Sequence, residues 1–349
     1  MSKCFTFVIN REKDVKTMRI LYLSVHEVLE YDELKIFTEL GHECFSHGAY
    51  CRPHIGSSLR PPIPEMSFDP HFADLVDRFP KNNLPPELIE DKDIIIIMHT
   101  PSLVIDNWEK IKHKRVIWRS IGQSVPEVER MLLPYREQGL EIVRYSPREK
   151  MIPNYIGADA VIRFYKDPKE YDGWVGNNRQ IMALNQSMKQ RWLECNYPIF
   201  HHACKGYPVK LFGPDNEGLP ENSGILTYEQ IKQEMRENRA FFYTGTRVTS
   251  YTLGFIEAFM TGIPIVSVGE TQGNHPSFEQ RTFEIHEIIE NGKEGFVSDN
   301  VLELRIYLNE LLNDHEFAKG ISENARKKAI RLFGKENIKE QWKRYLDKG

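Results

Sequence analysis

The sequence predicts an α/β protein with two Rossmann-like, doubly wound domains. Three observations lead to this fold class. Short β-branched runs alternate with amphipathic segments along the chain. The 349 residues are enough for two separate cores. A turn-rich segment, KDPKEYDGWVGNN at 166–178, separates two such series and predicts the domain boundary.

Composition narrows the class of protein. The chain is 40% hydrophobic and 28% charged, with a net charge of −4, which gives no reason to expect nucleic acid or an anionic membrane as partner. Five cysteines, an odd number without close pairs, indicate a reducing compartment, and no Cys/His group has zinc spacing. The N-terminus lacks a signal-peptide core, and no apolar run approaches the ~20 residues of a spanning helix. We therefore expect a cytoplasmic protein, and a peripheral membrane contact stays open.

The first half opens with a strand, CFTFVIN at 4–10, and continues with the buried strand MRILYLS at 18–24. The loop VHEVLEYDE, which contains Glu27, leads to a helix carrying DELKIFTEL, which ends at Gly41, and HECFS is the next strand. Residues 52–86 are rich in Pro, Gly and polar residues and predict an irregular insertion. This insertion is interpreted either as an acceptor-side loop or as a surface excursion without function.

Two strand ends in this half carry candidate site residues. DIIIIMHT places His99 just beyond a strand, and RVIWRSIGQS places Arg119 and Ser120 beyond another. Ligands of open α/β sheets collect at the carboxyl ends of the strands, although His99 fits a structural histidine equally well. Asp91 and Asp93 precede their strand, so we reject a metal-binding Asp-x-Asp motif. The basic segment 109–119 is interpreted as a solvated helix end, with an anionic acceptor as the alternative.

The second half repeats the alternation. EIVRYS and ADAVIRF complete the first domain, and RQIMAL opens the second. PVKLFG is a strand ending at Gly213, TYEQIKQEMRE is an amphipathic helix and AFFYTGT is a further strand. ENIKEQWKRYLDKG is predicted to be the terminal helix.

The stretch from 249 to 269, TSYTLGFIEAFMTGIPIVSVG, predicts a turn, a helix and a buried strand. Thr249 and Ser250 are the expected N-cap, and Gly262 with Pro264 ends the helix. Unpaired N–H groups at such a helix start suit a phosphate, and the carboxylate of Glu257 suits ribose hydroxyls. An ordinary crossover helix is the alternative that the pattern alone favours.

This stretch resembles the nucleotide-sugar segment of family 4 glycosyltransferases, which have the GT-B fold with two domains facing a cleft. Glu257-Ala258, Gly262 and Pro264-Ile265-Val266 match the family pattern, whereas Thr249 stands where its first glutamate is expected. HEIIENGKEGFV at 286–297 resembles a second family motif. The resemblance implies domains at 1–172 and 173–335, with a terminal helix, 336–349, that crosses back to the first domain.

The resemblance also implies a site. His99, Arg191 and Thr249 take the catalytic positions, with Arg191 replacing a family lysine and Asn185-Gln186 replacing a Gly-Arg pair. The backbone N–H groups at the helix start receive the donor diphosphate, and Glu257 binds the ribose. The implied donor-binding residues are Lys189, Gly213, Ser250, Tyr251, Thr252, Leu253 and Glu257, and the acceptor-side residues are Glu27, Arg119 and Ser120.

The predicted function is metal-independent transfer of a hexose or pentose, with retention, from a nucleotide-diphosphate sugar that serves as substrate, without a cofactor. The acceptor stays open among glycan, lipid, small molecule, nucleic acid and protein. Two other classes remain. One is a nucleotide-sugar epimerase of the same fold. The other is a non-catalytic partner subunit, which Thr249, Gln186 and the absence of glycine from the loop at 25–33 favour.

Overall fold

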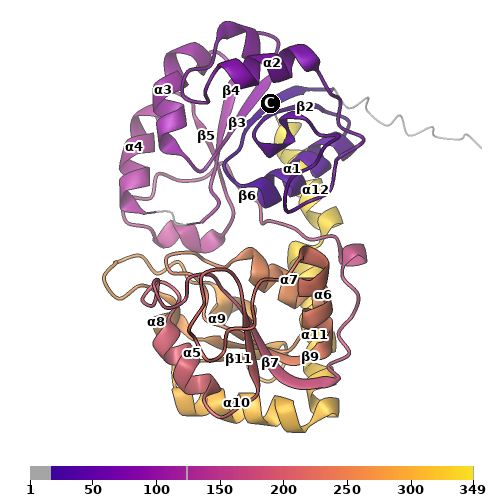
Figure 1. Cartoon of the computed structure of the whole chain (residues 1–349). Coiled ribbons are helices and arrows are strands. Elements are labelled where there is room, and N and C mark those ends of the chain that lie inside the picture. The colour runs from indigo at the N-terminus through magenta and orange to yellow at the C-terminus, as the bar shows by residue number, and fades with distance from the viewer. Residues whose placement is uncertain (1–16, 123–124, 349) are drawn as a thin grey trace, which may run out of the picture.

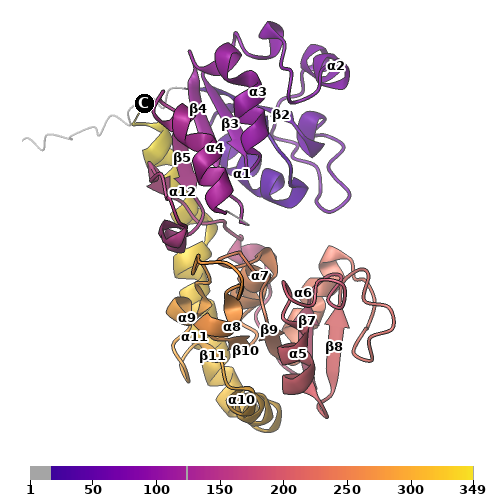
Figure 2. The same ribbon diagram turned by 90° about the vertical axis from the view of Figure 1, so that its left-hand side faces the viewer.

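The computed structural model describes residues 17–122 and 125–348, which form two α/β domains stacked one above the other (Figure 1). The strand predicted at 4–10 lies outside the described residues. Each domain has one parallel sheet covered by helices on both faces (Figures 1 and 2). The predicted fold class is therefore confirmed.

The first sheet has six strands in the order β2-β1-β3-β4-β5-β6. All of its pairings are parallel. The strand β3 is buried at every position, as β-branched runs inside parallel sheets are. The strands are β1 (Arg19–Leu23), β2 (Glu43–His47), β3 (Ile94–Met98), β4 (Arg115–Arg119), β5 (Glu141–Arg144) and β6 (Ala160–Val161), and the helices are α1 (Glu27–Glu39), α2 (Pro70–Arg78), α3 (Pro101–Ile111) and α4 (Pro126–Arg136).

The second sheet has five parallel strands in the order β11-β10-β9-β7-β8. Its strands are β7 (Asn178–Leu184), β8 (Val209–Phe212), β9 (Asn238–Tyr243), β10 (Ile265–Val268) and β11 (Gly295–Ser298). Its helices are α5 (Tyr197–Cys204), α6 (Tyr228–Glu237), α7 (Leu253–Thr261), α8 (Glu270–Gly273), α9 (Ile285–Ile288), α10 (Val301–Asn313) and α11 (His315–Phe333).

The terminal helix α12 (Lys335–Leu346) follows α11 directly and packs on the first domain, although the other elements of that domain lie at the opposite end of the chain (Figure 2). Its buried residues Ile338, Trp342 and Tyr345 recur at helical spacing and form one face. Trp342 meets Phe37 of α1 edge to face, with ring centroids 5.0 Å apart. Arg115 donates to the backbone oxygens of Tyr345 and Leu346, at 3.1 and 2.9 Å, so part of the basic segment at 109–119 anchors this helix.

Three local expectations differ from the structure. The loop predicted at 25–33 is mostly the first turns of α1, because His26 caps the helix by accepting from the Leu29 N–H at 3.4 Å. The insertion at 52–86 is not wholly irregular, since Asp69 caps α2 and Pro70 starts it. The helix α7 begins at Leu253 with Thr252 as N-cap, not Thr249 or Ser250. None of the helices in the described ranges is long and apolar enough to cross a membrane.

Candidate active site at the facing sheet edges

In each sheet the first strand has its successors on both sides, so the strand order reverses at one topological switch point. This point lies between β1 and β3 in the first domain and between β7 and β9 in the second. Such switch points open a crevice at the carboxyl ends of the strands, where ligands of this architecture bind. The second domain has a pocket there. It is lined by Leu184 at the end of β7 and Asn185 just after it, by Thr244 to Thr246 after β9, and by Thr252 before α7.

The start of α7 borders this pocket and offers backbone donors. Thr252 has no side-chain bond to the helix, and the first turn holds no acidic residue. Within the described residues, the N–H groups of Leu253 and Gly254 have no hydrogen-bond acceptor. These two amides, with the helix dipole behind them, form a site suited to a phosphate.

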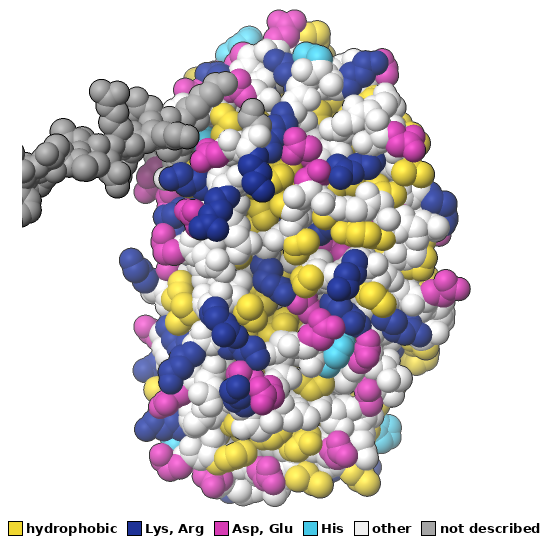
Figure 3. All heavy atoms as spheres, turned by 180° about the vertical axis from the view of Figure 1, so that it is seen from behind, with side chains coloured by type: hydrophobic (Ala, Val, Ile, Leu, Met, Phe, Trp, Pro, Cys, Tyr) yellow, Lys and Arg dark blue, Asp and Glu magenta, His cyan; other side chains and the backbone are white. Residues whose placement is uncertain are grey.

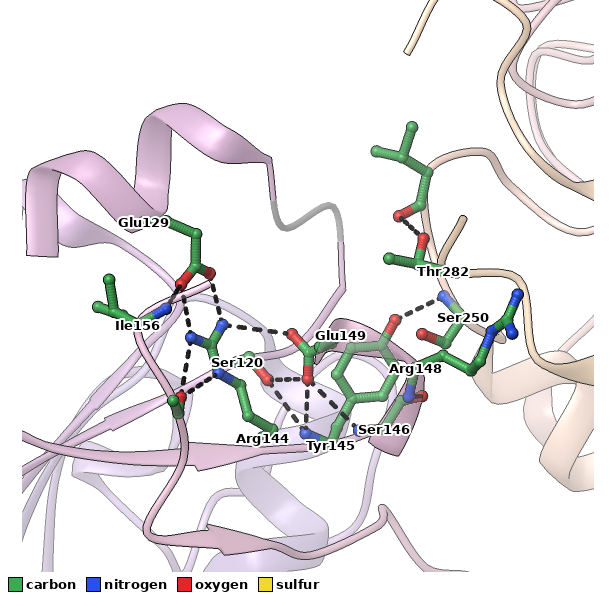
Figure 4. Close-up of polar contacts among 12 residues, drawn as sticks. Ser120, Glu129, Arg144, Tyr145, Ser146, Arg148, Glu149, Ile156, Ser250 and Thr282 are labelled. Atoms are coloured by element: carbon green, nitrogen blue, oxygen red, sulfur yellow. Dashed lines mark hydrogen bonds and ion pairs between the residues drawn. The ribbon is translucent and has the colours of Figure 1, made fainter. Parts of the chain in front are cut away.

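Two other amides of the predicted phosphate site are already in use. The Ser250 N–H donates to the Tyr145 hydroxyl of the first domain at 2.7 Å, as Figure 4 shows. The Thr252 N–H donates to the Tyr243 hydroxyl at 3.0 Å. The Tyr251 hydroxyl, in turn, donates to the Tyr145 carbonyl at 2.6 Å. Ser250 and Tyr251 therefore join the two domains, which the sequence did not predict.

Gly213 contributes by having no side chain. Its φ of 134° is a conformation that glycine tolerates, and a Cβ there would lie 2.1 Å from the Asn185 carbonyl oxygen. Asn216 holds these two backbone segments together, because its side-chain amide donates to the Asn185 and Gly213 carbonyls at 2.7 and 3.0 Å. The close approach of the β7 and β8 ends shapes the rim of the pocket.

Lys189 and Arg191 lie in the turn-rich segment after β7, next to Met188, which lines the pocket. Lys189 is exposed and Arg191 is half-buried. In the part of the chain that the structure describes, neither cation forms an ion pair. Both are therefore available to an anionic ligand.

Thr249 holds its hydroxyl inside its own turn, donating to the Thr246 carbonyl at 2.6 Å. Its methyl group faces Gly122 of the first domain. The side chain is thus part of the domain contact and presents no carboxylate-like acceptor.

Glu257 is buried, at 6% exposure, and pairs with two cations from outside its domain. Its Oε1 lies 3.0 Å from Arg60 Nη2, in the insertion, and 3.3 Å from Lys166 Nζ, in the linker. Its Oε2 accepts no hydrogen bond from the described residues and is not among their fully buried, unpaired atoms. One oxygen is therefore anchored and the other remains free to accept.

In the first domain His99 follows β3 in a left-handed conformation, with φ of 63°, which is uncommon for a residue other than glycine. Its Nδ1 is buried and has no hydrogen-bond partner among the described residues, and its backbone N–H donates to the Arg119 carbonyl at 2.8 Å. Burial, and then the nearby His26, lowers the pKa of His99. The ring is held neutral at the switch point.

A second pocket lies beside this switch point, at the carboxyl end of β1 and the start of α1. Glu27 lines it and accepts from Ser58 Oγ at 3.0 Å. Lys81 lines it too, donates to the Ser24 carbonyl and forms no ion pair within 17–122 and 125–348. Burial lowers the pKa of Lys81.

Arg119 and Ser120, predicted on the acceptor side, are fully buried structural residues instead. Arg119 Nε donates to Glu33 at 2.8 Å, and its guanidinium lies 4.6 Å over the Phe164 ring. Ser120 donates to Glu149 at 2.7 Å, in the network that Figure 4 displays. Successive side chains of a strand point to opposite faces of the sheet, and Arg119, the last residue of β4, points into the core. Its position at the strand end does not by itself reveal this direction.

Sequence reasoning missed Arg60, Tyr145 and Lys166. All three act across the domain boundary, so no local pattern marks them. No group of His, Cys, Asp and Glu able to hold a metal is present among the described residues. His201 pairs with Glu221 at 3.0 Å, and Asp91 pairs with Arg19 at 2.6 Å.

No protein-family model matches the chain, and no curated protein matches it. Solved structures do. HepE of Anabaena, in complex with UDP-glucose, is 15% identical and covers 95% of this chain and 100% of its own, with a TM-score of 0.67. Sucrose-phosphate synthase of Thermosynechococcus elongatus is 11% identical over 95% of this chain and 98% of its own, with a TM-score of 0.65. A glycosyltransferase of Rickettsia africae is 15% identical over 95% and 100%, with a TM-score of 0.67. These likenesses establish the GT-B fold.

Proposed function

We propose that the protein is a glycosyltransferase that takes a sugar from a nucleotide-diphosphate donor. The observation that carries this proposal is the pair of free amides, Leu253 and Gly254, at the start of α7 beside a pocket at the β7/β9 switch point. The GT-B fold supports it, and the UDP-glucose bound to HepE makes UDP-sugars the first donors to test.

In the proposed mechanism the two amides stabilise the negative charge that develops on the leaving diphosphate. Arg191 and Lys189 add cationic stabilisation, so that neither a metal nor a cofactor is required. Glu257 Oε2 accepts from the ribose hydroxyls. His99, on the facing sheet edge, contacts the transferred sugar, and the resemblance to family 4 supports retention of configuration.

The acceptor side is proposed to be the pocket that Glu27 and Lys81 line. Its mixture of a carboxylate and an ammonium group suits a hydroxyl-bearing glycan or small molecule. On the described part of the back of the molecule, side chains of both signs are interspersed (Figure 3), which disfavours a nucleic acid on that face.

A variant pair at Leu253 tests the proposal. Proline is favoured at the first helical position and removes the amide donor, and Thr252 already has the extended conformation that precedes proline. We expect Leu253→Pro to weaken UDP binding about 10- to 100-fold, the loss of one hydrogen bond to a charged group. Leu253→Ala removes the same side chain and keeps the amide, so it should bind UDP nearly as the wild type does. Equal losses in both variants, by calorimetry, would refute the diphosphate site.

A non-catalytic partner subunit is the second candidate. Two of the backbone amides predicted to bind the phosphate donate to tyrosine hydroxyls instead, and Thr249 offers no carboxylate. Slow hydrolysis of UDP-sugars without an acceptor separates the two candidates. Release of free sugar by the wild type, and its loss in Leu253→Pro, supports the transferase. UDP binding without any release supports the partner subunit.

A further inference from the structure

The insertion at 52–86 contacts the second domain through the side chain of Arg60. Arg60 is 9% exposed, and its Nη2 meets Glu257 Oε1 at 3.0 Å, although the two residues are 197 positions apart. Its guanidinium also lies 3.7 Å over the ring of Tyr228 at the start of α6. Arg60 thus contacts two helices of the second domain from a loop of the first.

Lys166, in the linker between the sheets, completes an interdomain charge cluster of Asp32, Arg60, Lys166 and Glu257. Its Nζ lies 3.0 Å from Asp32 Oδ2, in α1, and 3.3 Å from Glu257 Oε1. Burial opposes the charge on Lys166, but Asp32 and Glu257 outweigh it and raise the pKa of this lysine. Two cations and two carboxylates balance one another, and they come from the first domain, the linker and the second domain.

The interdomain charge cluster is arranged so that it fixes the position of the Glu257 carboxylate. Buried ion pairs contribute little net stability compared with apolar packing, so four buried charges at a domain boundary call for another reason. Both cations hold the same oxygen of Glu257, which fixes the carboxylate and leaves Oε2 accessible. The orientation of Glu257 is therefore set from outside its own domain.

We propose that Arg60, together with Lys166, is a positioning residue that aims Glu257 at the donor and couples donor binding to closure of the two domains. This inference rests on the proposed function. When the domains close, Arg60 reaches Glu257 and its free oxygen is oriented. By linkage, a nucleotide that binds this oriented carboxylate favours the closed form to the same extent.

The test compares three variants. Arg60→Met removes the charge at similar length, and Arg60→Lys keeps the charge but loses the planar contact with Tyr228. Arg52→Met is the matched control, since Arg52 belongs to the same insertion but pairs with Asp77 of its own domain. Binding of UDP is measured by calorimetry, and the radius of gyration by X-ray scattering with and without UDP. Circular dichroism verifies that each variant is folded.

We expect Arg60→Met to bind UDP about tenfold more weakly or worse, within the usual range of coupling between sites. Its radius of gyration without UDP should exceed that of the wild type and contract on adding UDP. Arg60→Lys should fall between the two, and Arg52→Met should match the wild type.

Wild-type affinity and wild-type dimensions in Arg60→Met would overturn the inference while leaving the proposed function intact. Tighter UDP binding in that variant would also overturn it, because Arg60 would then obstruct the site. If the wild type binds no nucleotide diphosphate at all, the proposed function fails, and the inference fails with it.

Discussion

For His99, both the strained backbone conformation and the position at a strand end indicate a functional role. A left-handed backbone costs a non-glycine residue about 1–2 kcal/mol, and the buried Nδ1, for which the described part of the chain offers no hydrogen-bond partner, adds to that cost. Strained residues of this kind persist where the surroundings hold them, and they gather at functional sites. The position of His99 beyond β3, on the edge that faces the second domain, fits a ligand-contacting role.

This strain leads to a prediction about His99→Gly. Glycine adopts the conformation freely, so we expect the stability to stay within about 1 kcal/mol of the wild type. Cleavage of UDP-sugar should fall at least tenfold, because the sugar loses a contact. Asn154→Gly is the control, since exposed Asn154 has the same φ of 63°. Unchanged turnover in His99→Gly would contradict the role of His99.

At the scale of elements, α12 shows how one helix stabilises a domain to which it is not adjacent in the chain. Its apolar face is buried against α1, and Arg115 binds the carbonyl groups at its end. A single apolar cluster continues from the first sheet through Tyr145, Tyr251 and Phe333 to Trp342. The two domains and this helix therefore share part of one core.

We expect Trp342→Ala to destabilise the protein by about 3–5 kcal/mol, as the loss of a fully buried large side chain does. Urea unfolding followed by circular dichroism measures the change. Arg344→Ala, at an exposed position of the same helix, should stay within about 0.5 kcal/mol of the wild type. A small effect at Trp342 would mean that α12 contributes little to the first domain.

At the scale of the whole molecule, buried histidines make stability depend on pH. Burial is the first cause that lowers the pKa of His26, His42, His47 and His99, all in the first domain. The folded state keeps these rings neutral, so the unfolded state binds more protons as the pH falls below about 6.5. Their contribution is present above that pH and is lost toward the lower folded-state pKa values.

We therefore expect the melting temperature to be lower at pH 5.5 than at pH 7.5. His42→Gln should reduce this difference, because one of the four groups no longer titrates. His71→Gln, at an exposed position, is the matched control and should leave the difference unchanged. A melting temperature that does not change between the two pH values would contradict this account.

The sequence by itself determined the two α/β domains, nearly all of the strands, the helix α7 with its end at Gly262, and the terminal helix, whose return to the first domain only the resemblance to family 4 implied. These features follow from hydrophobic periodicity and from Gly and Pro signals that lie within a few residues of one another. Capping of α1 by His26 and the N-cap position of Thr252 before α7 were missed, because a cap depends on geometry that residue type does not specify alone.

Only the tertiary structure decided what the candidate site residues contact. Arg119 points into the core, Ser250 and Tyr251 meet Tyr145, and Glu257 is held by Arg60 and Lys166. These partners are separated by roughly a hundred residues or more along the chain, and they meet because two domains pack against each other. No periodicity or spacing encodes such a meeting, since it depends on how the whole chain folds.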